Sequence, residues 1–201
     1  PSHVPALVGL TDFALGRQDW TRAVHSAERA GQALRDHAQK AHFLVVAGTI
    51  AQDRLADPEE KLNHAQSLFR QALAAEPRSA EAFSRLERSL HEARDFAALA
   101  ELYQRRIEVE PDCGKLQALH LMLARIARDE LKDGEHARHE LRAVLAQDAT
   151  HPEELAALAD LQFDDGQWAD AAETLIRRAR AEKSRTQLRE IFFKLGLIYS
   201  E

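Results

Sequence analysis

One phrase of sequence recurs five times along this chain and constrains the fold more than any other feature. Each copy contains a turn, then a position that is usually alanine, and then an apolar residue four positions later. The key position falls at Ala23, Ala65, Leu99, Ala137 and Ala171, at intervals of 42, 34, 38 and 34 residues. Because repeats of this period stack one small structural unit on the next, the sequence predicts a repeat architecture.

Another helical stretch precedes each copy of the phrase. In residues 80–93, for example, Phe83, Leu86 and Leu90 recur at helical spacing. The sequence therefore predicts helix pairs over 4–37, 38–78, 79–112, 113–150 and 151–183, followed by a single helix over 184–201. Glycines are predicted to end the first helices, and prolines to follow the second helices, at Gly16, Gly134, Gly166, Pro77 and Pro111.

Local signals also predict where two helices begin. Asp57-Pro58-Glu59-Glu60 predicts an N-cap, a proline in the first turn and a carboxylate that reaches back to the cap. Thr150 with Glu153 predicts a similar cap. Extra residues around Asp57–Lys61 are predicted to lengthen the turn inside the second pair. Residues Cys113–Leu119 are predicted to form a longer connection into the fourth pair.

The composition excludes several classes of protein. Glycine and proline are scarce, at 8 and 6 residues, which favours helices over a strand-and-turn fold. The net charge of −6 argues against nucleic acid and anionic membrane surfaces, since both require a concentrated positive field. The single cysteine, Cys113, cannot form an internal disulfide, and no apolar run is long enough to span a membrane.

A 34-residue step with this layout resembles the tetratricopeptide repeat family, and the resemblance covers essentially the whole chain. It implies an all-α fold, a right-handed α-solenoid of antiparallel helix pairs forming a single domain over 1–201. A related helical hairpin of the Sel1-like type is the alternative, but its longer, glycine-richer units fit the spacing less well. The matching residues are Phe83, Leu86, Phe96, Tyr103 and Pro111; Leu155, Leu158, Gly166, Trp168, Ala171 and Leu175; and Phe192, Leu195, Gly196 and Tyr199.

Two columns depart from the family pattern. Leu99 stands where the family prefers alanine, so the third pair is expected to cross less closely. The family also prefers a small residue in each first helix. Gly48, Ala159 and Gly196 satisfy that preference. At the equivalent position of the other first helices, the residues do not: Thr11, Glu87 and Arg125.

The resemblance implies a non-catalytic interaction scaffold that holds a peptide or protein segment on the concave face formed by the first helices. Apolar residues there would anchor the ligand and polar residues would orient it. For the apolar members of this face, ordinary helix packing is the alternative interpretation. The residues expected to contact the ligand are Asp12, Val45, Arg88, His91, Met122, Ile126, Asp129, Phe163 and Phe193.

No catalytic residue, metal site or cofactor is expected. The motif His136-x-x-His139-Glu140 lacks the H-E-x-x-H order that zinc proteases need, so it is predicted to be solvated surface. The segment Phe163–Trp168 lacks the alternating acidic ligands of a calcium loop and is predicted to be a turn between helices. The face predicted to bind the ligand also lacks the lysines and asparagines of chaperone-binding and glycosyltransferase-linked members.

Two alternative functions remain open. The chain could be the regulatory or substrate-recruiting segment of a larger enzyme, or a homo-oligomer formed through its apolar C-terminal helix. The ending Arg189–Glu201 is apolar almost all round, which predicts the first half of a sixth repeat rather than a cap. A fragment of a larger bacterial protein is therefore expected, in the cytoplasm. The periplasm stays open because the chain begins Pro1-Ser2 without methionine.

Overall fold

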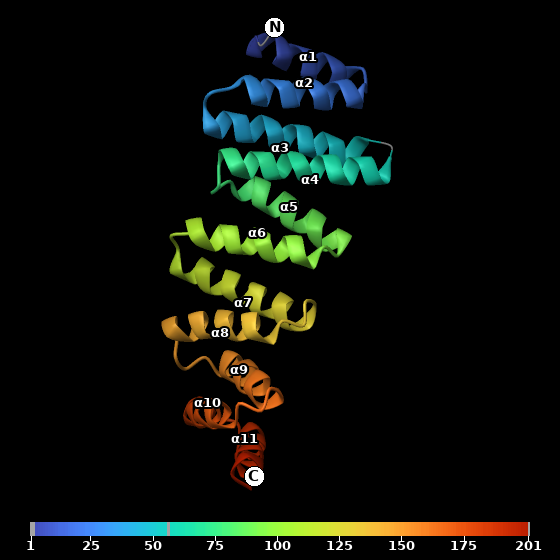
Figure 1. Cartoon of the computed structure of the whole chain (residues 1–201). Helices are drawn as coiled ribbons and strands as arrows, with labels where there is room; N and C mark the ends of the chain where they lie inside the picture. The colour runs from blue at the N-terminus through green and yellow to red at the C-terminus, as the bar shows by residue number, and fades with distance from the viewer. Residues whose placement is uncertain (1–2, 56, 201) are drawn as a thin grey trace. The chain divides into compact units, whose positions relative to one another are not determined.

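The computed structural model describes residues 3–55 and 57–200, and at residues 58–60 it describes the backbone alone. All eleven elements of secondary structure in this part of the chain are α-helices (Figure 1). The predicted all-α fold of helix pairs is confirmed. The helices are α1 Val4–Gly16, α2 Trp20–Ala33, α3 His37–Arg54, α4 Pro58–Ala75, α5 Ala80–Ala93, α6 Phe96–Val109, α7 Cys113–Asp129, α8 Gly134–Gln147, α9 Pro152–Asp164, α10 Trp168–Ala181 and α11 Arg185–Ser200.

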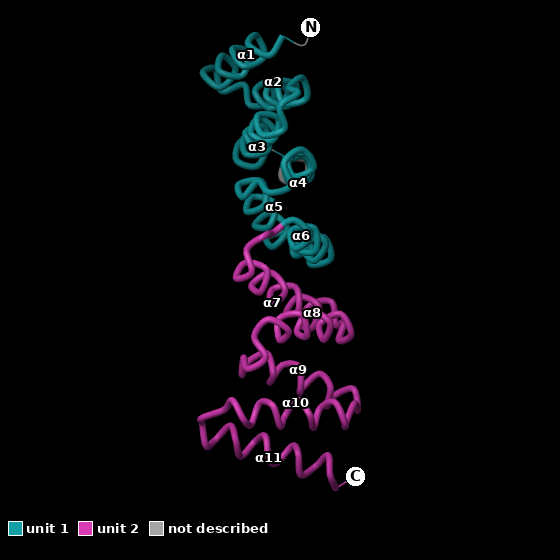
Figure 2. The backbone as a smooth tube through the Cα atoms, turned by 90° about the vertical axis from the view of Figure 1, so that its left-hand side faces the viewer, with its two compact units in different colours: residues 1–109 teal, residues 110–201 magenta. Residues whose placement is uncertain are grey.

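These helices form two compact units, residues 1–109 and residues 110–201 (Figure 2). Unit 1 contains α1 to α6 and unit 2 contains α7 to α11. Within each unit, every helix packs against the helices that precede and follow it in sequence. No helix in the described residues has both the length and the apolar character needed to span a bilayer.

The key position of the repeated phrase is buried in every pair. Ala23, Ala65, Ala137 and Ala171 are fully buried, and Leu99 is 1% exposed. An alanine at this position lets two helices cross closely because it adds only a methyl group between their backbones. The larger Leu99 separates α5 from α6, which pack least closely of the five pairs. The looser crossing predicted for the third pair is therefore confirmed.

The small-residue column of the first helices needs one correction. In α7 the buried small residue is Ala124, whereas the adjacent Arg125 is exposed. The prediction for this helix was therefore one residue out of register. Thr11 fits its buried position because its hydroxyl lies 2.9 Å from both the Leu7 carbonyl oxygen and Ser26 Oγ.

Glycines lie at the ends of two of the three first helices, as predicted. Gly166 follows α9 with φ +69°, in the left-handed region that glycine adopts without strain. Gly16 is the last residue of α1, and the left-handed residue beyond it is Gln18. After α7 it is Lys132, and Gly134 begins α8 instead of ending α7, so that prediction was wrong.

The predicted proline stops are confirmed, whereas one predicted cap is wrong. Pro77 and Pro111 each lie two residues beyond the end of a second helix. Thr150 does not cap α9, because its backbone N–H and hydroxyl both donate to the Asp148 carboxylate. The helix begins instead at Pro152, after His151.

Extra residues in the second and fourth pairs lengthen helices rather than loops. The helices α3 and α4 have 18 residues each, and α4 starts directly after Asp57. The predicted contribution of the Glu60 side chain to this cap lies outside the described residues. Residues Cys113–Leu119, predicted to be a connection, form the first two turns of the 17-residue helix α7.

Candidate functional site

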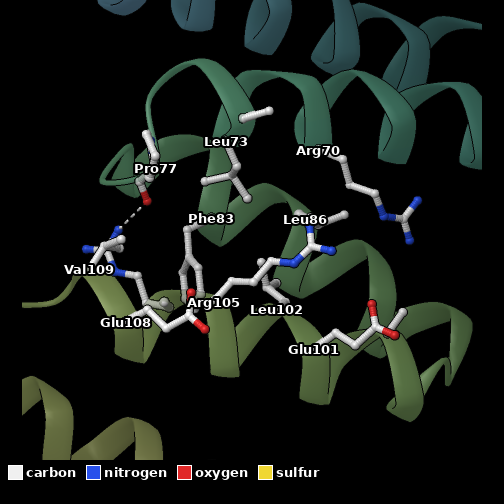
Figure 3. Close-up of a pocket in the computed structure, with 13 residues that line it drawn as sticks. Arg70, Leu73, Pro77, Phe83, Leu86, Glu101, Leu102, Arg105, Glu108 and Val109 are labelled. Carbon is white, nitrogen blue, oxygen red and sulfur yellow. Dashed lines mark hydrogen bonds between the residues drawn. The ribbon is translucent and has the colours of Figure 1, made fainter.

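A groove of about 350 Å³ with an apolar wall lies between α4, α5 and α6 of unit 1. Leu73 and Leu86 point into the space between α4 and α6, next to Phe83 (Figure 3). Leu102 and Val109 complete the apolar wall on the side of α6. We call this cavity the α4–α6 groove.

The loose crossing of α5 and α6 explains why a cavity forms here. Buried Leu99 separates the two helices, and a polar contact replaces the usual small residue one turn away. There the Tyr103 hydroxyl donates to Glu87 Oε1 at 2.6 Å. Burial raises the pKa of Tyr103, and the hydrogen bond to Glu87 raises it further, so the phenol stays protonated at neutral pH. The helices α5 and α6 therefore stay apart at their crossing, and the groove lies beside this crossing.

Five charged residues surround the apolar wall: Arg70, Glu101, Arg105, Arg106 and Glu108. The Arg106 guanidinium lies 5.4 Å from the Phe83 ring centroid, and its Nη1 donates to the Pro77 carbonyl oxygen at 3.5 Å. Arg105, Glu101 and Glu108 have no ion-pair or hydrogen-bond partner among the described residues. Their charged groups are therefore available to a ligand.

The α4–α6 groove has the size of a small ligand pocket. Its volume falls at the lower end of the roughly 300–1,000 Å³ typical of ligand pockets. An apolar wall with a charged rim binds a large apolar side chain through burial and orients the flanking polar groups.

The arrangement of the helix pairs and the residues at their crossings identify the type of fold. Antiparallel helices alternate along each unit, and a buried alanine or other small residue lies at most of their crossings. The fold is tetratricopeptide-like.

No protein-family model matches the chain, and no curated protein matches it either. Solved structures similar to it include PilF of Pseudomonas aeruginosa, at 16% identity and a TM-score of 0.49, covering 98% of this chain and 84% of PilF. A tetratricopeptide repeat protein from Parabacteroides merdae has 15% identity and a TM-score of 0.46, with coverages of 96% and 73%. YrrB, described as a tetratricopeptide protein with an unusual peptide-binding site, has 15% identity and a TM-score of 0.46, with coverages of 94% and 91%.

The site residues predicted on the first helices of unit 1 lie away from the α4–α6 groove, and none of them lines it. Asp12, Arg88 and His91 are exposed on α1 and α5 of this tetratricopeptide-like unit. Val45 is only 2% exposed, so its side chain belongs to the core and offers no surface to a ligand. Its inclusion in the predicted site was wrong. The position was chosen by its spacing from the equivalent positions of the other first helices, and the spacing did not show that packing buries this side of α3.

In α7, the predicted residues have different environments. Met122 is 49% exposed and Ile126 is half-buried. The Asp129 carboxylate accepts hydrogen bonds from Arg128 at 2.6 and 3.0 Å, and these bonds lower the pKa of Asp129. A ligand would therefore compete with Arg128 for this carboxylate.

In unit 2, the predicted residue Phe163 lies next to a charged contact between α9 and α11. Lys194 donates to Asp160 at 2.5 Å, and its ammonium lies 5.8 Å from the Phe163 ring centroid. Phe163 also meets Trp168 edge to face, with centroids 5.1 Å apart. Phe193 is exposed on α11. The turn predicted over Phe163–Trp168 is confirmed.

The histidine motif of α8 contains a contact that the sequence did not predict. Glu140 is 5% exposed, and its carboxylate lies 2.6 Å from His120 Nδ1 and 3.4 Å from His136 Nε2. The prediction of solvated surface was therefore wrong for Glu140, although it holds for the exposed His139. His120 lies 20 residues away on α7, so no local pattern connects it with the motif. Within the described residues, no cluster of three or more His, Cys, Asp or Glu side chains could hold a metal ion.

Proposed function

We propose that this chain is a non-catalytic scaffold that binds a segment of another protein in the α4–α6 groove. The observation that carries the proposal is an apolar groove whose rim holds charged groups without internal partners. Its walls come from α4, α5 and α6, so one bound segment would contact three helices at once.

The groove specifies the chemistry of its occupant. Leu73, Phe83 and Leu86 favour a large apolar side chain, and the volume accommodates one or two of them. Three guanidinium groups face two carboxylates at the rim, so the balance of charge favours an acidic residue beside the apolar anchor. Arg105 is the guanidinium best placed to receive it, since no residue of the described chain occupies it.

A peptide selection tests the proposal directly. Random peptides displayed on phage would be selected on the immobilised chain, and the dissociation constants of the enriched peptides measured by fluorescence anisotropy. We expect enriched peptides to share a large apolar residue next to Asp or Glu.

Variants at exposed positions locate the binding site without disturbing the core. Ala74→Glu places a charge inside the groove and is expected to weaken binding at least about tenfold, equivalent to ~1.4 kcal/mol. Arg105→Glu is expected to weaken it by a similar factor because it repels the acidic residue. Arg29→Glu changes an exposed arginine of α2 and is the matched control. Peptides that bind Ala74→Glu and Arg105→Glu as tightly as the original chain would contradict the proposal.

The same peptides test the first-helix face. Arg88→Glu combined with Met122→Ala changes two of the residues predicted there and leaves the groove intact. Loss of binding in this double variant alone would move the site from the α4–α6 groove to that face.

A further inference from the structure

Two helices form the long walls of the α4–α6 groove. The lining residues of α4 run from Arg70 to Pro77, and those of α6 run from Ala98 to Val109. Pro77 and Val109 lie at one end of the groove, and Arg70 and Glu101 lie at the other (Figure 3). Because a helix rises about 1.5 Å per residue, the wall on α6 is about 16 Å long, which matches about three turns of a second helix. The groove is therefore long enough to hold a helical segment lengthwise.

The walls offer few hydrogen bonds to the backbone of a bound segment. Inside α4 and α6, the backbone N–H and C=O groups bond within their own helix. Two carbonyl groups at the ends of the walls accept from arginines of the same chain: Arg78 Nε donates to the Val109 carbonyl oxygen at 2.9 Å, and Arg106 Nη1 donates to that of Pro77 at 3.5 Å. An extended segment pressed against these walls would therefore lose hydrogen bonds to water without replacing them. A helical segment pairs its own backbone groups and keeps them paired in the groove.

A row of charged residues follows the groove along α6. Glu101, Arg105 and Glu108 are exposed and lie at positions i, i+4 and i+7, so they share one face of the helix. Among the described residues, none of the three has an ion-pair or hydrogen-bond partner. Arg70 belongs to the opposite wall, where its Nη2 donates to Gln66 Oε1 at 3.5 Å. The row on α6 therefore presents negative, positive and negative charge in turn.

This row specifies the charges of a helix that lies beside α6. Such a helix rises at the same rate as α6, so two of its residues seven positions apart face Glu101 and Glu108 in either orientation. Basic residues at these two positions, and an acidic residue opposite Arg105, would make three pairs of opposite charge. The acidic residue follows the first basic residue by four positions in a parallel helix and by three in an antiparallel one. Its position therefore reports the orientation of the bound helix.

The apolar wall fits an adjoining face of the same bound helix. Leu73 and Leu86 lie in the groove next to Phe83 (Figure 3), and Leu102 lines it from α6. An amphipathic helix gathers its apolar residues into one stripe through spacings of three and four residues. A stripe next to the charged row would enter the groove while the row meets its counterpart on α6. One amphipathic helix thus satisfies the apolar wall and the charged row together.

We propose that the segment bound in the α4–α6 groove is an amphipathic α-helix of the partner protein, with an acidic residue between two basic residues that lie seven positions apart. This inference rests on the proposed function and goes further, because it names the conformation of the segment and the order of its charges. It also gives a role to Glu101 and Glu108, which select the two basic residues.

Synthetic peptides of about 16 residues test the order of the charges. The matched peptide carries the row Lys-Glu-Lys beside a stripe of leucines with one phenylalanine, and the opposite row on its solvent face. The reversed peptide exchanges the two rows, so both peptides have the same composition and net charge. Each is made with both spacings of the central residue. Fluorescence anisotropy is expected to show that the matched peptide, with one of the spacings, binds at least about tenfold more tightly than its reversed counterpart. Equal affinities at both spacings would overturn the proposal.

Exchanging charges on the chain tests the selecting residues. Glu101→Lys/Glu108→Lys is expected to weaken binding of the matched peptide at least about tenfold. The same variant should strengthen, by a similar factor, binding of a peptide with glutamates in place of the two outer lysines. Asp53→Lys/Glu92→Lys is the matched control, since both residues are exposed in unit 1, neither lines the groove and the change of net charge is the same. Equal effects of the two double variants would indicate general electrostatic attraction and overturn the proposal.

The position of a proline in the peptide tests the conformation. A proline at the centre of the peptide, on its solvent face, interrupts a helix but not an extended segment, whereas a helix tolerates a proline in its first turn. We expect the central proline to weaken binding more than about tenfold and the first-turn proline to leave it unchanged. Equal binding of the two proline peptides would exclude a bound helix.

The phage-selected peptides separate this proposal from the proposed function. If they lose affinity for Ala74→Glu but tolerate a central proline or lack the charged row, the groove binds a segment and only the helix proposal fails. If no peptide binds the groove, the proposed function fails, and the helix proposal fails with it.

Discussion

A Cβ atom placed on Gly48 would lie 2.6 Å from Cε1 of Phe69, closer than packed atoms approach one another. Phe69 is fully buried, so its ring cannot move aside. The closest helix pair of unit 1 therefore depends on the absence of a side chain at one position.

Gly48→Ala is expected to destabilise the chain by about 1–2 kcal/mol, because overpacking outweighs the better helix propensity of alanine. Urea unfolding followed by circular dichroism measures the change. Gly9→Ala, in a helix with open space around it, is expected to be neutral or stabilising by up to about 1 kcal/mol. A stabilising Gly48→Ala would show that α3 and α4 can separate at little cost.

Leu99→Ala tests whether Leu99 separates α5 from α6. Replacing a buried leucine by alanine costs about 2–5 kcal/mol, and the lower values belong to sites that can close around the cavity. Because the other four pairs cross over alanine, we expect α5 and α6 to approach each other and the loss to be about 2 kcal/mol. Leu68→Ala, at a fully buried position other than the key position of its pair, is expected to cost more. An equal or larger loss for Leu99→Ala would count against this role.

Tyr103→Phe is expected to lower the free energy of unfolding by about 1–2 kcal/mol at neutral pH, since Glu87 loses its donor. The effect depends on pH in a defined direction. Folding raises the pKa of Tyr103, so its contribution is complete below the unfolded value of about 10 and is lost as the pH rises above it.

The difference between Tyr103→Phe and the original chain should therefore be constant from about pH 7 to about pH 9 and shrink above about pH 10. Urea unfolding across this range measures it. Tyr199→Phe changes an exposed tyrosine and is expected to leave the unfolding free energy at pH 8 unchanged. A difference that grew with pH would contradict the assigned role of the phenol.

Gly166→Ala is expected to cost about 1–2 kcal/mol, because alanine is strained at the φ of +69° that follows α9. Gly134→Ala is the comparison, since Gly134 begins α8 in helical conformation and has no close contact at its Cβ position. Thermal unfolding of both variants would show whether the conformation of the turn, rather than the loss of a glycine, sets the change. Equal effects would exclude backbone strain at Gly166.

The helix pairs could be predicted because the residues at the helix crossings recur at regular intervals along the sequence. Alanine at Ala23, Ala65 and Ala171 is a local signal for a close crossing, and its replacement by Leu99 correctly predicted a looser pair. The register inside α7 could not be read in the same way. Leu123, Ala124 and Ala127 form the buried face of α7. Other apolar residues of this helix also recur at helical spacing, so the sequence allowed Arg125 to be assigned to the small-residue position in place of Ala124.

The candidate site was harder to predict than the fold. The α4–α6 groove depends on how three helices pack, so its wall combines residues between 70 and 109 that share no local pattern. Val45 had the expected spacing but is buried, because the spacing identifies a helical face without showing what covers it. The contact of Glu140 with His120 joins α8 to α7, and no local sequence pattern in either helix predicts it.

The loose joint between α5 and α6 has a consequence for the motions of unit 1. Local opening requires least free energy where buried contacts are fewest. Amide hydrogen exchange should therefore be fastest within this pair, and slow in α3 and α4, which pack tightly. A segment bound across α4, α5 and α6 would link the loosely packed pair α5 and α6 to the tightly packed α4. Binding should therefore slow amide hydrogen exchange in residues well beyond those that contact the segment.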